Sequence, residues 1–240
     1  MSHLRKALLM IVLCAALLSA KADDVTIDFS EGKWDKSTWK VFKCFPTKPV
    51  ERLKDFYFSQ KKDCISYDCS AEDLKRGDDN CILVYDTGRN EAEFEVVLES
   101  GKGHPGILIS PEFSDDGILL KGYCVFVADY TIAAWYVDAD PVKKSSTYSS
   151  LVQITRWQPK LQKHKITCRY DKRGFAIKVD DSDTVVLHPK WDYGMASVNG
   201  FKVNTKIGIW GCHGLCNFYS LVIKEKGLLL FDAVDPNAKK

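Results

Sequence analysis

Three glutamates at alternate positions of one apolar segment have types and spacing that could support catalysis. Glu91, Glu93 and Glu95 stand at i, i+2 and i+4, so one strand would point all three carboxylates to the same face. Retaining glycosidases use two carboxyl groups about 5–5.5 Å apart, one as nucleophile and one as acid. Alternate strand positions lie about 6.6–6.8 Å apart, which side-chain orientation can bring into range. The alternative is a solvated strand face without catalytic work, and this is the interpretation we favour.

The segment Cys212-His213-Gly214-Leu215-Cys216 offers three further reactive side chains. Zinc is held by four ligands in structural sites, and no second Cys/His pair has a matching spacing. A Cys–His nucleophile would need a free thiolate beside an imidazole, which an oxidising compartment disfavours. We therefore expect a disulfide-bearing turn, no metal site and no catalytic cysteine.

Four aromatic side chains are the better candidates for binding a ligand. Flat rings give a sugar face an apolar platform, while polar neighbours bind its hydroxyls. Core packing is the alternative for each ring, and one of the adjacent Trp135 and Tyr136 must face the core if their strand alternates. The candidate ligand-binding residues are Trp135, Trp157, Trp191 and Tyr193.

Histidines and aspartates elsewhere in the chain suggest no ligand set. His104, His164 and His188 are scattered, so solvated or hydrogen-bonded roles are expected. Aspartates in two turns could supply calcium oxygens, but turn chemistry explains them, since Asp favours such positions. These aspartates are Asp115, Asp116, Asp180, Asp181 and Asp183. We expect no cofactor, with calcium as the alternative.

Residues 1–22 have the pattern of a secretory signal peptide. Arg5 and Lys6 precede an apolar run of about 12 residues, and Ala20-Lys21-Ala22 has small residues where a signal peptidase reads. Such a run is shorter than the roughly 20 residues that cross a bilayer, although a retained anchor is the alternative. We expect a secreted, extracellular protein without a membrane span.

Removal of this segment changes the charge and the cysteine count. It lowers the 34 basic residues to 31, against 32 acidic ones, so no basic excess remains to bind nucleic acid. Cys14 is lost, and an even number of cysteines in a secreted chain predicts disulfides. From their clustering we expect Cys212–Cys216, Cys124–Cys168 and two bridges within residues 44–81, with Cys44 paired to the closing loop as the alternative. The remaining cysteines are Cys44, Cys64, Cys69, Cys81, Cys124, Cys168, Cys212 and Cys216.

The elements that must position these residues are short apolar or alternating runs separated by turns, without a long amphipathic helix. This pattern predicts an all-β sandwich over residues 23–226. Residues 44–81 form a disulfide-rich N-terminal excursion without strand or helix period, and 227–240 are a C-terminal tail. The closing strand at 218–223 is expected to pair with 25–29 or 39–42. The other expected strands are 82–85, 91–99, 107–109, 123–129, 131–137, 151–157, 165–170, 175–179, 184–187 and 207–210.

The order of these features resembles the concanavalin A-like lectin/glucanase superfamily, a two-sheet jelly-roll sandwich that includes laminin-G-like modules. The resemblance is carried by EFEVVL at 93–98, by 105–109 with GYCVFV at 122–127, by KHKITCRY at 163–170 with its following hairpin, and by 208–210 with 217–223. It implies a curved sheet whose concave face often holds a carbohydrate. The superfamily includes both lectins and glycosidases, and fold alone does not choose between them.

These observations leave three classes of function open. A secreted non-catalytic module that binds an extracellular carbohydrate is the interpretation we favour, because no convincing acid/base set is found. An extracellular glycosidase or lyase using the paired glutamates is one alternative. A structural module that binds another protein is the other, so the expected partner is a glycan or an extracellular glycoprotein.

Overall fold

The computed structural model describes residues 24–43, 58–69, 80–89, 92–128, 131–140, 145–154, 163–171, 174–181, 185–187 and 204–224. Within these ranges regular structure is almost entirely β-strand, and the helical structure there is too short to cross a membrane. The elements are β1 (Val25–Asp28), η1 (Lys36–Thr38), β2 (Lys40–Lys43), β3 (Phe58–Gln60), β4 (Ile65–Tyr67), β5 (Asn80–Asp86), β6 (Ala92–Ser100), β7 (Gly106–Phe113), β8 (Leu119–Ala128), β9 (Thr131–Asp140), β10 (Ser145–Ile154), β11 (Lys163–Asp171), β12 (Gly174–Val179), β13 (Val185–Leu187), β14 (Lys206–Cys212) and β15 (Cys216–Lys224).

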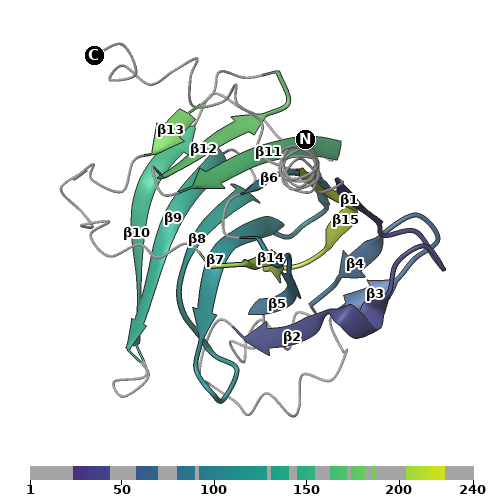
Figure 1. The fold of residues 1–240 in the computed structure, drawn as a ribbon, viewed down its shortest axis with the longest axis horizontal. Helices are drawn as coiled ribbons and strands as arrows, with labels where there is room; N and C mark the ends of the chain where they lie inside the picture. Colours follow the sequence, from purple (N-terminus) through teal and green to yellow (C-terminus); the bar gives the residue numbers. More distant parts are fainter. Residues whose placement is uncertain are drawn as a thin grey trace, which may run out of the picture.

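The described strands form two antiparallel sheets (Figure 1). One has eight strands in the order β13-β12-β11-β6-β15-β4-β3, with β1 also paired to β15. The other has seven, in the order β10-β9-β8-β7-β14-β5-β2. The predicted all-β, two-sheet sandwich is therefore confirmed.

The seven-stranded sheet carries buried apolar side chains on both of its faces. Both sheets contribute to the inner core between them; for example, Phe94 and Ile166 meet Val125 and Ile209 there. A second set, the outer cluster, comes from the seven-stranded sheet alone and therefore lies on the face directed away from the other sheet. Its buried members are Ile82, Val84, Leu108, Leu119, Cys124, Phe126, Ala133, Val137, Trp210 and Cys212, and partly buried Phe42, Phe113 and Trp135 pack against them.

The first described strand closes the sandwich against the last one. β1 pairs antiparallel with β15, with Val25 opposite Ile223 and Asp28 opposite Ser220, as expected for 25–29. The second candidate, β2, pairs instead with β5 in the other sheet. Aromatic packing of Phe29 on Trp39, with ring centroids 5.5 Å apart, joins the two segments where the chain passes between the sheets.

Two expectations about the elements were wrong. Residues 44–81 contain regular structure, because β3 and β4 pair with each other and β4 pairs with β15. The buried segment Ile65–Tyr67 is too short to show a period, and its pairing partner decides its conformation. β10 begins at Ser145, earlier than the expected 151, because its polar Ser/Thr-rich start pairs along β9.

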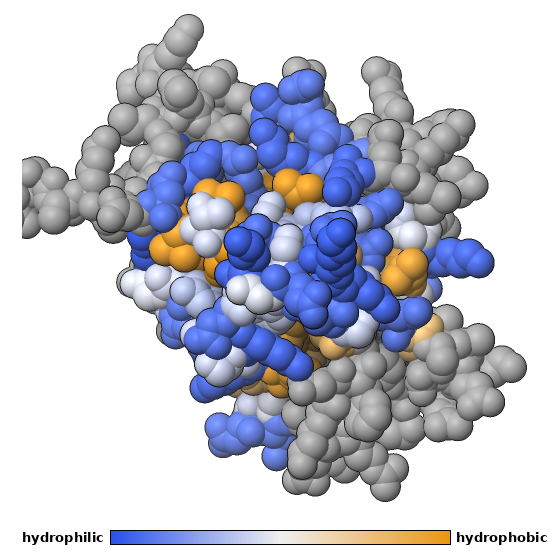
Figure 2. Space-filling view, turned by 90° about the vertical axis from the view of Figure 1, so that its right-hand side faces the viewer, coloured by the Kyte–Doolittle hydropathy of each residue, from blue (hydrophilic) through white to orange (hydrophobic). Residues whose placement is uncertain are grey.

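One side of the molecular surface is mainly hydrophilic. On the side of the molecule shown in Figure 2, hydrophilic residues predominate and apolar residues form small separate areas among them. Such scattered apolar residues are ordinary on protein surfaces, so that side offers no reason to expect a large hydrophobic interface among its coloured residues.

Replacing Gly211 by alanine tests the packing at the centre of the sandwich. A Cβ at this β14 position would lie 2.2 Å from Cγ of the buried Tyr67 ring. We expect Gly211→Ala to lower the free energy of unfolding by about 1–3 kcal/mol, the usual cost of overpacking, measured by urea denaturation. Gly122→Ala is the matched control, since its nearest neighbour is Pro111 Cα at 3.4 Å. Equal stability of both variants would contradict the described packing.

Candidate functional site on the outer face of the seven-stranded sheet

Three aromatic rings meet on the outer face of the seven-stranded sheet. Phe126 of β8 lies 4.9 Å from Trp135 of β9 in an edge-to-face arrangement, and 6.2 Å from Trp210 of β14, between ring centroids. Phe126 and Trp210 are buried, whereas Trp135 is half-buried. Phe126 thus packs against Trp135, and part of the Trp135 side chain remains accessible.

Strand alternation explains why Trp135 faces outward. Its neighbour Tyr136 packs against the inner core, 5.1 Å from Tyr123 between ring centroids. Side chains on successive strand residues point to opposite faces, so Trp135 must point to the outer cluster. Of the four predicted ligand-binding residues, Trp135 is the one within the described ranges; Trp157, Trp191 and Tyr193 lie outside them.

The aromatic character of this face extends beyond the three rings. Phe42 of β2 and Phe113 of β7 stack with their centroids 3.9 Å apart, and both pack against the outer cluster. The ring of His104 lies 6.4 Å from Phe126 and adds a polar group at the edge. The face therefore combines apolar rings with a hydrogen-bonding side chain, the composition typical of sugar sites. We call Trp135, Phe126, Trp210 and His104 the aromatic face.

The glutamates considered as catalytic acids lie on the other sheet. Phe94 and Val96 of β6 point into the inner core, so Glu93 and Glu95 point outward from the eight-stranded sheet, away from the aromatic face. Lys224 of β15 donates a hydrogen bond to Glu95 and lies 3.9 Å from Glu93. Lys165 of β11 lies 3.7 Å from the second oxygen of Glu95. These carboxylates are partly buried and ion-paired rather than simply solvated, and Glu91 lies outside the described residues.

The same outer surface of the eight-stranded sheet carries a hydrogen-bonded network. Ser66 donates to Asn217 at 2.6 Å, and the amide of Asn217 and the hydroxyl of Tyr219 both donate to Glu99. The Lys163 ammonium lies 3.7 Å above the Tyr219 ring. Burial and the adjacent carboxylate raise the pKa of Tyr219. This network links β4, β15, β6 and β11, and its internal bonds explain it as structural.

Two loops at one end of the aromatic face are joined backbone to backbone. The amides of Gly101 and Gly103, between β6 and β7, donate to the carbonyl of Leu215 at 2.9 and 3.1 Å. Glycine is required here, because a Cβ at Gly103 would lie 2.5 Å from the oxygen of Gly214. The amide of His104 donates to the carbonyl of Cys212 at 2.7 Å. We call residues 101–105 and 213–215 the loop pair.

The loop pair brings together side chains that are far apart in the sequence. Donor atoms of His104, Cys212 and His213 all lie within 4.8 Å of one another, and the two imidazole centroids are 5.1 Å apart. The expectation of no metal site rested on the missing second Cys/His pair. His104 reaches Cys212 from another loop, which spacing along the chain cannot reveal.

The structure holds the seven described cysteines as buried thiols and contradicts two of the predicted bridges. Cys124 belongs to the outer cluster and Cys168 to the inner core, so the seven-stranded sheet separates them. Cys212 likewise belongs to the outer cluster, whereas Cys216 faces the inner core and its thiol donates to the carbonyls of Cys212 and Gly214. Pairing among the cysteines of 44–81 stays a prediction, because Cys44 lies outside the described residues.

Among the aspartates and histidines considered for other roles, Asp180 and His164 contact each other within the protein. Asp180 contacts Nδ1 of the buried His164 at 2.6 Å and accepts from the backbone amide of Lys165 at 2.9 Å. Asp115 and Asp116 are exposed in the turn between β7 and β8. Asp183 and His188 lie outside the described residues.

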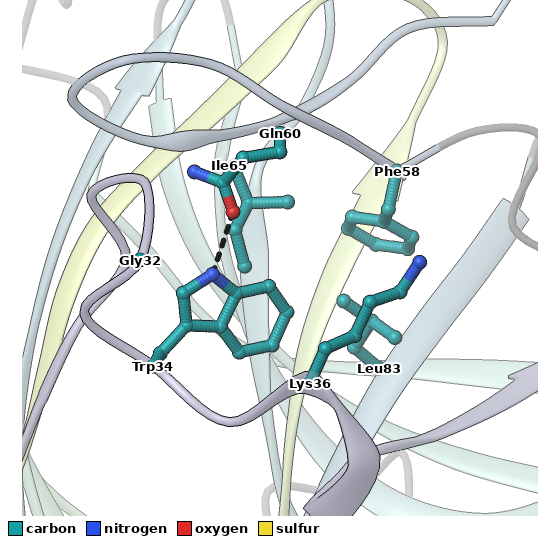
Figure 3. Close-up of a pocket in the computed structure, with 7 residues that line it drawn as sticks. All are labelled: Gly32, Trp34, Lys36, Phe58, Gln60, Ile65 and Leu83. Atoms are coloured by element: carbon teal, nitrogen blue, oxygen red, sulfur yellow. Dashed lines mark hydrogen bonds between the residues drawn. The ribbon is translucent and has the colours of Figure 1, made fainter.

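A pocket of about 130 Å³ lies between the turn before η1 and the β3–β4 hairpin (Figure 3). The indole of Trp34 donates to Gln60 at 2.6 Å. The Gln60 amide nitrogen donates to the carbonyls of Phe29, Lys61 and Cys64. These internal bonds occupy the polar groups that a ligand would use, so the pocket is better explained as a joint between segments. Its lining residues are Gly32, Trp34, Lys36, Phe58, Gln60, Ile65 and Leu83.

Comparison with solved structures identifies similar folds. SCLam, a non-specific endo-beta-1,3(4)-glucanase from family GH16, matches with a TM-score of 0.53 and 12% identity over 86% of this chain and 92% of that chain. The laminarinase from Rhodothermus marinus matches with a TM-score of 0.52 and 8% identity over 85% and 96%. The Crh5 transglycosylase matches with a TM-score of 0.52 and 13% identity over 86% of each chain. No protein-family model and no curated protein matches the sequence. The chain has the concanavalin A-like jelly-roll fold that its sequence resembles.

Replacing Glu95 by glutamine tests the interpretation of the acidic strand. The hydrogen bond from Lys224 to Glu95 raises the pKa of Lys224 above its ordinary 10.5. A raised lysine pKa contributes stability that is present below the ordinary value and is lost as the pH rises through the raised one. We expect Glu95→Gln to cost less than about 1 kcal/mol near neutral pH, and the difference from wild type to shrink as the pH rises beyond 10.5 and through the raised pKa of Lys224. Thermal melts across this range measure it, and a difference that grows with alkaline pH would refute the assignment.

Peptide mapping of the unreduced protein tests the placement of the cysteines. Because the seven-stranded sheet separates Cys124 from Cys168, we expect no peptide that links them. The same mapping should find no Cys212–Cys216 link, since these thiols face opposite sides. Either linked peptide would require a different alternation in β8 or at the β14–β15 turn.

Proposed function

We propose that this protein is a secreted, non-catalytic module that binds an extracellular carbohydrate on its aromatic face. The observation that carries the proposal is the edge-to-face support of the half-buried Trp135 by the buried Phe126, on the outer side of the seven-stranded sheet. A rigidly held indole with one accessible part can stack on the apolar face of a sugar ring.

Preorganisation supports this role for Trp135. The planes of Trp135 and Phe126 meet at 88°, and those of Phe126 and Trp210 at 69°. Such packing fixes the ring before a ligand arrives, so binding loses little further side-chain freedom. The His104 imidazole beside Phe126 would supply a hydrogen bond to a hydroxyl group.

The fold comparisons favour a glycan over other ligands. The glucanase and the laminarinase are carbohydrate-active by name. Their low identity to this chain leaves the ligand to be argued from the site itself.

Catalysis by the paired glutamates is less well supported than binding. Glu93 and Glu95 project from the opposite sheet and are paired with lysines, so they would not meet a glycan on the aromatic face. A nucleophile and an acid must both flank the scissile bond. An extracellular glycoprotein could be the partner if its glycans bind the aromatic face. Binding of a protein surface without any glycan is the competing function.

Replacing Trp135 by alanine tests the proposal on a glycan array. We expect the wild-type protein to bind at least one class of glycan, and Trp135→Ala to lower the affinity by at least about tenfold, as for a central aromatic contact. Trp34→Ala is the matched control, because Trp34 is also a half-buried tryptophan but lines the pocket beside the β3–β4 hairpin and is not part of the aromatic face. Melting curves for both variants confirm that they fold.

Three results would contradict the proposal. The wild type could bind no glycan and instead capture a deglycosylated matrix protein. Trp34→Ala could abolish glycan binding while Trp135→Ala leaves it intact, which would move the site to the pocket. Hydrolysis of a bound glycan would show that the module is catalytic.

A further inference from the structure

We propose that His104, Cys212 and His213 form a Zn²⁺ site at the loop pair. The two histidines and the cysteine each offer one donor atom, and these atoms lie within 4.8 Å of one another. Two imidazoles and one thiol are the ligand types that zinc takes in proteins. The site shares His104 with the aromatic face, but zinc binding is measured without a glycan, so its failure is distinguishable from failure of the glycan proposal.

The donors are held in place by the backbone rather than by each other. The amide of His104 donates to the carbonyl of Cys212 at 2.7 Å, and the thiol of Cys212 lies 3.4 Å from the carbonyl oxygen of His104. The hydroxyl of Ser100 donates to the carbonyl of Gly103 at 2.6 Å and fixes the approach to His104. A site whose ligands are fixed in the folded chain needs little ordering when the ion binds.

Glycines allow the two loops to approach closely enough to share an ion. A Cβ at Gly101 would lie 2.9 Å from the carbonyl oxygen of Leu215, and one at Gly214 would lie 2.9 Å from that of Lys102. His213 itself has φ of 60°, the left-handed region that residues other than glycine seldom adopt. This conformation places its imidazole against His104.

The donor set selects among metals. Calcium and magnesium take oxygen ligands, which these side chains do not offer, whereas a thiolate with imidazoles suits zinc. Three protein ligands leave a fourth tetrahedral position for water or another ligand. Burial is graded across the cluster, since Cys212 is buried, His104 is half-buried and His213 is exposed, so the ion would enter from the side of His213.

The side chain of Cys212 faces away from the described cysteines of the inner core. Its thiol lies in the outer cluster, whereas Cys69, Cys81, Cys168 and Cys216 belong to the inner core. Cys124 shares the outer cluster with Cys212 but is not part of the His/Cys group. Cys124 is therefore the matched control for a buried thiol outside that group.

Metal titration of the full chain tests the proposal. We expect the protein, purified without chelator, to bind Zn²⁺ at one equivalent per chain by isothermal titration. Cobalt substituted for zinc should show a thiolate-to-metal charge-transfer band. Binding should tighten as the pH rises, because the ligand thiol and imidazoles must be deprotonated.

Three variants localise the ion. Cys212→Ser should remove the charge-transfer band and weaken zinc binding by more than about tenfold. His213→Asn should also weaken binding, and it preserves the fold because His213 is exposed and asparagine tolerates the left-handed conformation. Cys124→Ser should leave both the band and the affinity unchanged.

The proposal is overturned if the folded wild type binds no zinc, or if Cys212→Ser and His213→Asn bind it as wild type does. It is equally overturned if peptide mapping finds Cys212 in a disulfide in the purified protein, since an oxidised sulfur does not serve as the thiolate ligand. Loss of the charge-transfer band in Cys124→Ser alone would place the ion elsewhere.

Discussion

Burial of both faces of the seven-stranded sheet is the constraint on which the rest of the structure depends. One of its interior strands, β14, alternates between Ile207 and Ile209, directed into the inner core, and Trp210 and Cys212, directed into the outer cluster. A strand with two covered faces has little room for side chains. Gly208 fits at its position because it has no side chain: a Cβ there would lie 2.8 Å from Ile82. The aromatic face exists because apolar side chains also cover the outer side of this sheet.

Much of the fold could be predicted from the sequence. The alternation of apolar and charged residues in β6 and the apolar runs in β8, β9 and β14 are patterns typical of strands in a sandwich. The pairing of β1 with β15 was among the expected partners for the same reason. The short β3–β4 hairpin could not be found, since Ile65–Tyr67 is strand only by virtue of its neighbour β15. A short segment therefore has a local pattern compatible with several conformations, and its pairing within the sheet decides which one it adopts.

The candidate site was predictable only in part. Trp135 was identified as a ligand candidate, and the alternative that it or Tyr136 faces the core is decided by the packing of Tyr136. Phe126 and Trp210 were missed as its supports. A signal for Phe126 was present in GYCVFV at 122–127, where apolar residues at consecutive positions indicate a strand covered on both faces. The approach of His104 to Cys212 carries no comparable sequence signal, because it depends on contact between two residues that lie 108 positions apart in the chain.

The pairing of β1 with β15 has a consequence for the order in which the chain can fold. β15 occupies the middle of the eight-stranded sheet, where β1, β4 and β6 all pair with it. During synthesis the edges of these three strands that pair with β15 therefore stay unpaired until residues 216–224 leave the ribosome. Contacts between residues so distant in sequence form slowly, and exposed edges in the interval favour association between chains. Efficient production of this protein thus depends on preventing association of these exposed strand edges until β15 has been synthesised.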